Sequence, residues 1–298
     1  MIRPFTLIVS LLSASFVFAF DGPPYVLQWP DSTGDILVAE SSSYTLHRYY
    51  RQDDGSTGVE SLTMSIGQNG AGKRREGDLR TPYGVYFITD RLDTASLHPK
   101  YGSAAYPMDY PSARDRQLGR TGSGIWLHGV LPGTVTPIPR DTDGCIAINN
   151  QQLNSLAPRI DVLTTPIIIT NTIDRSLGGT YSDLRDELSE RLSGWTDSLA
   201  EGRLDALLAF YSPNFSYQGL GLDDFAVLQF DEMASANIVG VSHNDVFIAA
   251  DPTESGVFVT RFMLHVELSD GGRREQRKRL YWQRDEAGAF RIIAEDEA

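Results

Sequence analysis

The spacing of the apolar residues changes near residue 173, and this change limits the folds open to the chain. Before it, short apolar runs of β type lie at 45–50, 85–89 and 166–170, with clusters of Gly, Pro, Asn and Asp between them. This pattern is typical of an all-β sandwich or barrel. One short helix is expected, at about 150–157. The first half of the chain therefore predicts a mostly β domain built as a sandwich.

The second half has a different pattern. Large apolar side chains recur there at intervals of three or four residues, as on one face of a helix, at Leu184, Leu188, Leu192, Trp195 and Leu199. A second helix is expected at 203–211. Strand-like runs follow at 245–249, 257–268, 277–284 and 290–294. Helices followed by a strand meander predict a small α+β domain.

The first nineteen residues have the pattern of a secretory signal peptide. An almost uncharged apolar run at 4–18 follows Arg3 and ends in Val17-Phe18-Ala19, a small-residue cleavage pattern. The run is too short to span a bilayer. We therefore expect export to the periplasm, although an uncleaved amino-terminal anchor stays open. The expected organisation is a signal peptide at 1–19, a first domain at 24–172, a linker at 173–182 and a second domain at 183–298.

The formal net charge of −13 disfavours two classes of partner. Nucleic acids and anionic membrane surfaces would both repel an acidic chain. The one basic cluster, 273–279, is interrupted by Glu275 and Gln276, and we interpret it as a solvated pair of strands. No nucleic-acid partner is expected.

Cys145 is the only cysteine of the chain. Exported proteins usually pair their thiols, yet a single cysteine has no partner within its own chain. The residue is therefore a buried inert thiol, a link to another chain or a reactive nucleophile. Composition alone does not decide among these.

His128 and Cys145 both lie where an apolar strand is expected to begin or end. The run 124–127 ends on His128-Gly129, and Cys145 opens the run 146–148. A thiol is mostly protonated at neutral pH, so a nearby imidazole is needed to remove its proton and later protonate a leaving amine. The backbone amides of Gly144 and Cys145 are candidate oxyanion donors. A backbone carbonyl, with Gly129 one candidate, is expected to orient the imidazole.

These residues carry a resemblance to a known family. His128-Gly129 followed by Thr142-Asp143-Gly144-Cys145 resembles the active-site pattern of the L,D-transpeptidase catalytic domain. The stretch 76–86, with Gly77-Asp78 and Thr81-Pro82-Tyr83-Gly84, is similar to a turn of that family. The stretches 106–111 and 119–126 resemble the segment that leads to its catalytic histidine. The likeness covers most of residues 35–170.

The resemblance implies a cysteine acyl-enzyme that acts on peptidoglycan stem tetrapeptides and needs no cofactor. Cys145 would be the nucleophile and His128 the base and acid, while Thr142 would orient the loop or contact substrate. The acceptor would be an amine, giving a cross-link, or water, as in an L,D-carboxypeptidase. Many cross-linking members carry arginine two residues after the cysteine, where this chain has Ala147. Without this arginine, the chain resembles the branch of the family that contains cell-shape carboxypeptidases and enzymes that release wall-anchored lipoprotein.

The second domain resembles the NTF2-like cone domain found in cell-shape carboxypeptidases. Its weaker motifs are 192–195, 210–215 and 278–282, followed by 290–293. Such domains serve as enzymes, ligand pockets or dimerisation modules, so a small ligand or a dimer partner is open. A non-catalytic wall-binding protein is the remaining alternative.

Other chemistry finds little support in the sequence. The histidines are scattered and show no metal-ligand spacing, so no metal site is expected. His47 and His98 are interpreted as surface or structural groups, and a pocket role for His243 and His265 is the weaker alternative. Three aromatic residues either line the substrate groove or belong to the core: Tyr106, Tyr110 and Trp126.

Overall fold

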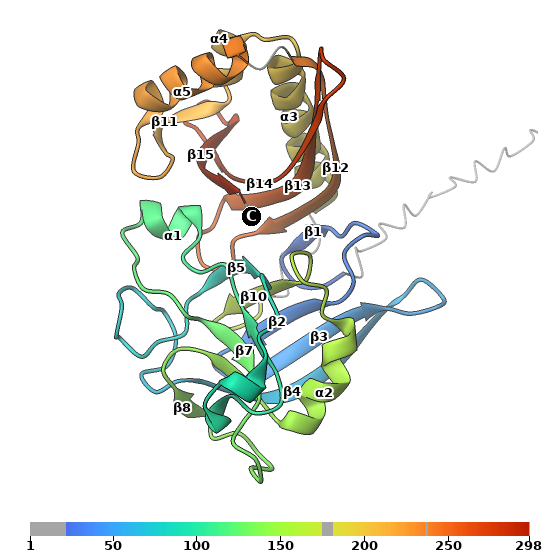
Figure 1. Ribbon diagram of the computed structural model, residues 1–298, viewed down its shortest axis with the longest axis vertical. Helices are drawn as coiled ribbons and strands as arrows, with labels where there is room; N and C mark the ends of the chain where they lie inside the picture. Colours follow the sequence, from blue (N-terminus) through green and yellow to red (C-terminus); the bar gives the residue numbers. More distant parts are fainter. Residues whose placement is uncertain (1–21, 175–180, 236–237, 298) are drawn as a thin grey trace, which may run out of the picture.

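Two curved sheets, stacked along the long axis of the molecule, organise the chain (Figure 1). The computed structural model describes residues 22–174, 181–235 and 238–297. The expected signal peptide, and most of the expected linker, lie outside these residues. The predicted order, a mostly β unit followed by an α+β unit, is confirmed.

The first sheet has nine strands in the order β5-β10-β2-β3-β4-β9-β7-β6, with β8 paired to β4. The strands are β2 (Ile36–Glu40), β3 (Thr45–Arg51), β4 (Thr57–Gly67), β5 (Gly84–Phe87), β6 (Ala105–Pro107), β7 (Trp126–His128), β8 (Arg140–Thr142), β9 (Ile146–Ile148) and β10 (Pro166–Thr170). The helical turns between them are η1 (Thr94–Ser96), η2 (Pro99–Tyr101), α1 (Ala113–Gln117), α2 (Asn150–Leu156) and η3 (Ala157–Arg159). The expected helix at 150–157 is thus present, whereas α1 was not predicted.

The apolar run of β10 is continuous because both of its faces are buried. β10 pairs in parallel with β2 and antiparallel with β5. Since side chains alternate along a strand, Ile167 and Ile169 face the core of the first domain, while Ile168 faces a second core. That second core also contains Trp195 and Trp282 from the C-terminal half. One face of the first sheet therefore packs against the second domain.

The second sheet has six strands in the order β1-β12-β13-β14-β15-β11. They are β1 (Val26–Gln28), β11 (Tyr211–Ser216), β12 (Ile238–Ala250), β13 (Val257–Leu268), β14 (Arg273–Arg284) and β15 (Phe290–Glu297). β1 pairs with β12 through Val26 and Ala249, although it precedes the whole first sheet in sequence. The strand lies within the range 24–172 expected for the first domain, yet it extends the sheet of the second.

Three helices accompany this sheet: α3 (Tyr181–Ala200), α4 (Leu204–Leu208) and α5 (Leu222–Ser235) (Figure 1). The predicted apolar face of α3 is buried at Leu188, Leu192 and Trp195. The helix expected at 203–211 ends at Leu208, and β11 begins at Tyr211 because this side chain is buried and belongs to the sheet. α5 was not predicted.

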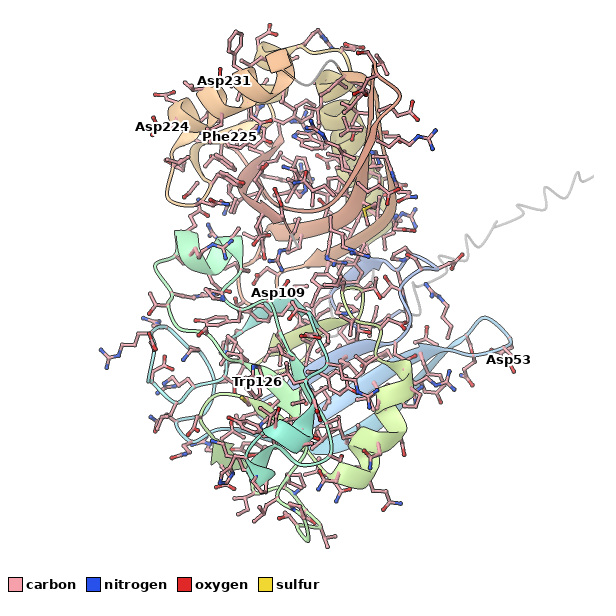
Figure 2. The ribbon with its side chains drawn as sticks, viewed as in Figure 1. Asp53, Asp109, Trp126, Asp224, Phe225 and Asp231 are labelled. Atoms are coloured by element: carbon pink, nitrogen blue, oxygen red, sulfur yellow. The ribbon has the colours of Figure 1, made fainter. Side chains whose placement is uncertain are left out.

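Arg279 corrects the interpretation of the basic cluster as solvated. Arg273 is exposed as expected, but Arg279 is 1% exposed and lies between the two domains. Its Nη1 donates to Asp109 of the first domain at 2.7 Å, and its Nε donates to Asp296 of β15 at 2.8 Å. Figure 2 shows Asp109 at this junction. The side chain is buried because the first domain covers this end of β14, which strand periodicity alone does not reveal.

Candidate active site

Two adjacent parallel strands bring His128 and Cys145 to the same face of the first sheet. β7 pairs with β9 so that Leu127 lies opposite Ile146 and His128 opposite Ala147. Leu127 and Ile146 point into the core. Because neighbouring side chains alternate, His128 and Cys145 lie on the opposite face. The strand-end arrangement predicted from sequence is therefore present.

Both reactive side chains line one pocket of about 340 Å³. The segment between β7 and β8 supplies apolar groups to its wall, including Leu131 and Ile138. The remaining lining residues are Ser65, Lys100, Tyr101, Gly124, Gly129, Val130, Thr134, Asp141, Thr142, Asp143 and Ala147. The pocket has room for a peptide segment next to the thiol.

The imidazole of His128 is held in one tautomer. Its Nδ1 lies 2.5 Å from the carbonyl oxygen of Gly129. A carbonyl only accepts, so Nδ1 carries the proton and Nε2 keeps its lone pair. The ring is buried, and the Tyr101 ring packs edge-on against it with the centroids 5.1 Å apart. Burial lowers the pKa of His128 to about 4, so the ring is neutral at pH 7.

Asn150 fixes the backbone that holds His128, and sequence analysis missed it. Its Oδ1 accepts from the amides of Ser103 and Val130 at 3.1 Å, and its Nδ2 donates to the Val130 carbonyl at 2.7 Å. A Cβ on Gly129 would lie 2.1 Å from Asn150 Oδ1, so only glycine fits there. The available signal was the pair Asn149-Asn150 at the start of a short helix: Asn149 caps α2, which leaves the second amide for another role.

The thiol of Cys145 is also neutral at rest. Its side chain is buried, and Sγ donates to the carbonyl of Gly124 at 3.5 Å. Burial raises the pKa of Cys145 to about 11. The resting site therefore holds a thiol and a neutral imidazole, so deprotonation must accompany the attack on a substrate.

The residues before Cys145 form a turn that Thr142 closes. The Thr142 hydroxyl donates to the Cys145 carbonyl at 2.7 Å and accepts from the Gly144 amide at 3.2 Å. Gly144 has φ 130°, and a Cβ there would lie 2.8 Å from the Arg80 carbonyl oxygen. The Gly144 amide is thus used inside the turn, which leaves the Cys145 amide as the oxyanion donor to propose.

Asp78 organises the neighbouring segment that contains Arg80. It accepts from the Lys73 ammonium at 2.9 Å and from the amides of Arg74, Arg75 and Arg80. Burial alone would raise its pKa, but these hydrogen bonds outweigh burial and lower it to about 2. The stretch at 76–86 therefore builds a rigid turn next to Gly144, as its sequence pattern suggests.

The other histidines lie away from the pocket. His47 contacts Ser61 on the neighbouring strand, and the His98 ring caps η2. His243 contacts Thr196, and His265 contacts Asn244 and Glu275 in the second domain. None of these four lines the pocket that contains Cys145.

The three aromatic candidates do not line the Cys145 pocket. Tyr106 and Tyr110 belong to the core of the first domain. Trp126, labelled in Figure 2, is half-buried, and its ring packs at a tilt on the Tyr101 ring with the centroids 4.8 Å apart. The core interpretation is therefore correct for both tyrosines, and Trp126 supports Tyr101.

The second domain has a separate pocket of about 340 Å³. Its lining combines the apolar side chains of Trp195, Leu199 and Leu264 with charged ones such as Arg274 and Lys278. A small ligand of this domain stays a prediction. Within residues 22–174, 181–235 and 238–297, no helix is long and apolar enough to cross a membrane.

Comparison with known proteins finds a family model that matches the first domain. Residues 34–169 match the L,D-transpeptidase catalytic domain. The match supports a peptidoglycan-modifying activity for this part of the chain. A search of curated protein sequences gives no match.

Solved structures resemble nearly the whole chain. Bd1075 of Bdellovibrio bacteriovorus is 21% identical with a TM-score of 0.70, covering 93% of this chain and 98% of that one. The helical cell shape determining protein Pgp2 of Campylobacter jejuni is 23% identical with a TM-score of 0.73, covering 92% and 95%. An NTF2-like protein of Pseudomonas putida, 12% identical with a TM-score of 0.34, covers 39% and 87%. The first two likenesses show a shared fold along most of the chain.

Proposed function

We propose that this protein, whose residues 34–169 match the L,D-transpeptidase catalytic domain, is a periplasmic acyltransferase of peptidoglycan stem tetrapeptides. One observation carries the proposal: Cys145 and His128 face the same pocket, and the hydrogen bond from His128 Nδ1 to Gly129 leaves Nε2 able to take the thiol proton. The expected division into a catalytic domain, a linker and a second domain is part of this proposal.

The first half-reaction forms a thioester. Sγ of Cys145 attacks the carbonyl carbon of the L,D bond after diaminopimelate while His128 Nε2 accepts the thiol proton. The bond to the nitrogen of D-alanine then breaks, and His128 returns the proton to that nitrogen, so that neutral D-alanine amine leaves. The Cys145 amide stabilises the intermediate oxyanion. The raised pKa of Cys145 and the lowered pKa of His128 agree with a resting pair in which both groups are neutral, so the proton moves as the sulfur attacks.

The second half-reaction releases the acyl group. An acceptor attacks the thioester carbon and gives its proton to His128 Nε2, and the departing Cys145 sulfur takes that proton back. An amine acceptor gives a cross-link, whereas water gives a tripeptide. Ala147 favours water, because this buried residue adds no charged group to the pocket for a second peptide strand. L,D-carboxypeptidase activity is therefore the second candidate.

The test uses the protein that lacks its expected signal peptide. It is incubated with disaccharide tetrapeptide, and the masses of the products are measured by mass spectrometry. Tripeptide identifies water as acceptor, and dimers identify an amine. Cys145→Ala is expected to abolish both. Because Cys145 is the only thiol, a thioester appears as a single mass addition to the intact protein. An unchanged tetrapeptide, with no mass addition, would favour a non-catalytic wall-binding protein instead.

The description of Pgp2 as a helical cell shape determining protein suggests the cellular role. We extend the proposal to cell shape. Loss of the Cys145 thiol in the native cell is expected to change cell curvature, measured by microscopy against cells that carry the unmodified gene. Unchanged curvature would restrict the proposal to the chemical activity.

A further inference from the structure

An ion pair stands at the wall of the Cys145 pocket, and no step of the proposed mechanism uses it. Lys100 and Asp143 both line the pocket. The ammonium nitrogen of Lys100 lies 3.0 Å from Asp143 Oδ2, and the side chains are 49% and 60% exposed. Gln68 Nε2 donates to the other carboxylate oxygen at 3.3 Å. The pair is thus open to solvent at the wall of the pocket.

The backbone of Lys100 is tied to the catalytic histidine. Lys100 lies in η2, next to Tyr101, whose ring packs on His128 and whose carbonyl accepts from the Gly129 amide at 3.0 Å. The Lys100 amide donates to the His98 ring at 3.1 Å. The backbone at Lys100 is therefore fixed on both sides, while its four-carbon side chain keeps rotational freedom.

The Lys100 charge reaches both reactive groups. Burial has the largest effect on both pKa values: it lowers that of His128 and raises that of Cys145. The ammonium of Lys100 lowers each of the two values. The charges of the pocket are otherwise negative. Among the described residues that line it, Asp141 and Asp143 are acidic, and Lys100 is the one lysine or arginine.

The leaving group of the proposed reaction carries a negative charge. D-Alanine at the end of a stem peptide has a free carboxylate, which lies two bonds from the nitrogen that leaves the acyl carbon. This carboxylate must come to rest close to the thiol, and the two aspartates repel it. A cation that can rotate away from its resting partner offers the binding site that it needs.

We propose that Lys100 binds the terminal carboxylate of the leaving D-alanine, and that Asp143 holds the ammonium in the free enzyme. The inference rests on the proposed function and identifies Lys100 as the residue that recognises the carboxyl terminus of the stem peptide. Binding exchanges one carboxylate for another on the same ammonium. Asp143 thus competes with the substrate, and Lys100 makes the enzyme prefer a free carboxyl terminus over an extended or amidated one.

The test compares two disaccharide tetrapeptides, one ending in D-alanine and one in D-alaninamide. The unmodified enzyme is expected to prefer the acid by about 10- to 100-fold in kcat/KM, the range of one charge-assisted hydrogen bond. Lys100→Gln is expected to bring the ratio of the two kcat/KM values close to one. Lys100→Arg keeps the charge and is expected to keep most of the preference. Asp143→Asn removes the competitor and is expected to lower KM for the acid several-fold.

Each result bears on a distinct claim. A purely structural role of Lys100 would lower both kcat/KM values together and leave their ratio unchanged, which overturns the inference. Equal turnover of acid and amide by the unmodified enzyme also overturns it, while the proposed function stands. Turnover of neither peptide overturns the proposed function and this inference with it.

Discussion

The active-site pocket and the junction between the domains both bury polar side chains, but they treat charge in opposite ways. In the pocket, His128 and Cys145 are buried with backbone carbonyls as their hydrogen-bond partners. Burial lowers the pKa of His128 and raises the pKa of Cys145, so both groups are neutral. At the junction, Arg279 is buried between two carboxylates that keep it charged. Burial without a counter-charge leaves both groups neutral at rest, whereas burial with a counter-charge keeps the ion charged and fixes structure.

Removal of the proton acceptor is the strongest test of the difference between the pocket and the junction. His128→Gln fills a similar volume but takes no proton, so kcat/KM for tetrapeptide is expected to fall by about 10²- to 10⁴-fold. Folding at pH 7 is expected to persist, because the imidazole is neutral in the folded state. Product mass analysis gives the rate, and urea unfolding gives the stability. A loss of less than tenfold would remove His128 from the proposed role.

The junction should respond in stability and not in chemistry. Arg279→Met leaves Asp109 and Asp296 buried without their shared cation, so the free energy of unfolding is expected to fall by about 3–5 kcal/mol. The carboxylate of Asp296 keeps its ion pair with Arg116 at 3.0 Å, so the loss is expected to fall mainly on Asp109. Urea unfolding at pH 7 measures the change.

A matched variant of the same strand controls this experiment. Arg273 belongs to β14 as well, but its side chain is 79% exposed and its ion pair with Glu267 is long, at 3.5 Å. Arg273→Met is expected to change the free energy of unfolding by less than about 1 kcal/mol. Equal losses of unfolding free energy in the two variants would show that burial of Arg279 at the junction does not contribute to stability.

The pH dependence of stability separates the two regions further. His128 has a pKa of about 4 in the folded protein against 6.5 as its ordinary value. Between these values the unfolded chain binds a proton that the folded protein does not, so stability falls as the pH falls from 6.5 to 4. The effect amounts to about 3 kcal/mol when complete.

Comparison with His128→Gln isolates this contribution from that of the carboxylates. The difference in unfolding free energy between the unmodified protein and the variant is expected to shift in favour of the variant as the pH falls from 6.5 to 4. His98→Gln, which removes an exposed imidazole outside the pocket lining, is measured in parallel. A constant difference for His128→Gln would contradict a buried neutral imidazole.

The active site was easier to predict than the junction, because its signals are local. His128 and Cys145 each stand next to a short apolar run and a glycine, and β10 and β13 have the bounds that their apolar patterns predict. β1 has only three residues, and its partner β12 lies more than 200 residues away. A pairing of this kind has no local pattern.

Arg279 and Asn150 show a second limit. Arg279 belongs to a basic run of the kind that is usually solvated, and its burial depends on a domain that covers it from elsewhere in the chain. Asn150 looks like a helix-start residue, and its contacts with Val130 and Ser103 follow only from tertiary packing. Sequence therefore predicts the candidate reactive groups better than the residues that position them.

The smallest expected effect concerns the turn before Cys145. Thr142→Val keeps the side-chain shape but leaves the Gly144 amide and the Cys145 carbonyl without their shared partner, at a cost of about 1–3 kcal/mol in stability. Thr142→Ser retains the hydroxyl and is expected to restore most of that loss. If Thr142 orients the loop, as both hydrogen bonds indicate, Val lowers kcat with little change in KM. If it contacts substrate instead, KM rises while stability hardly changes. Measuring both constants and the unfolding free energy for the two variants decides between these roles, because only the orienting role couples catalysis to the stability of the turn.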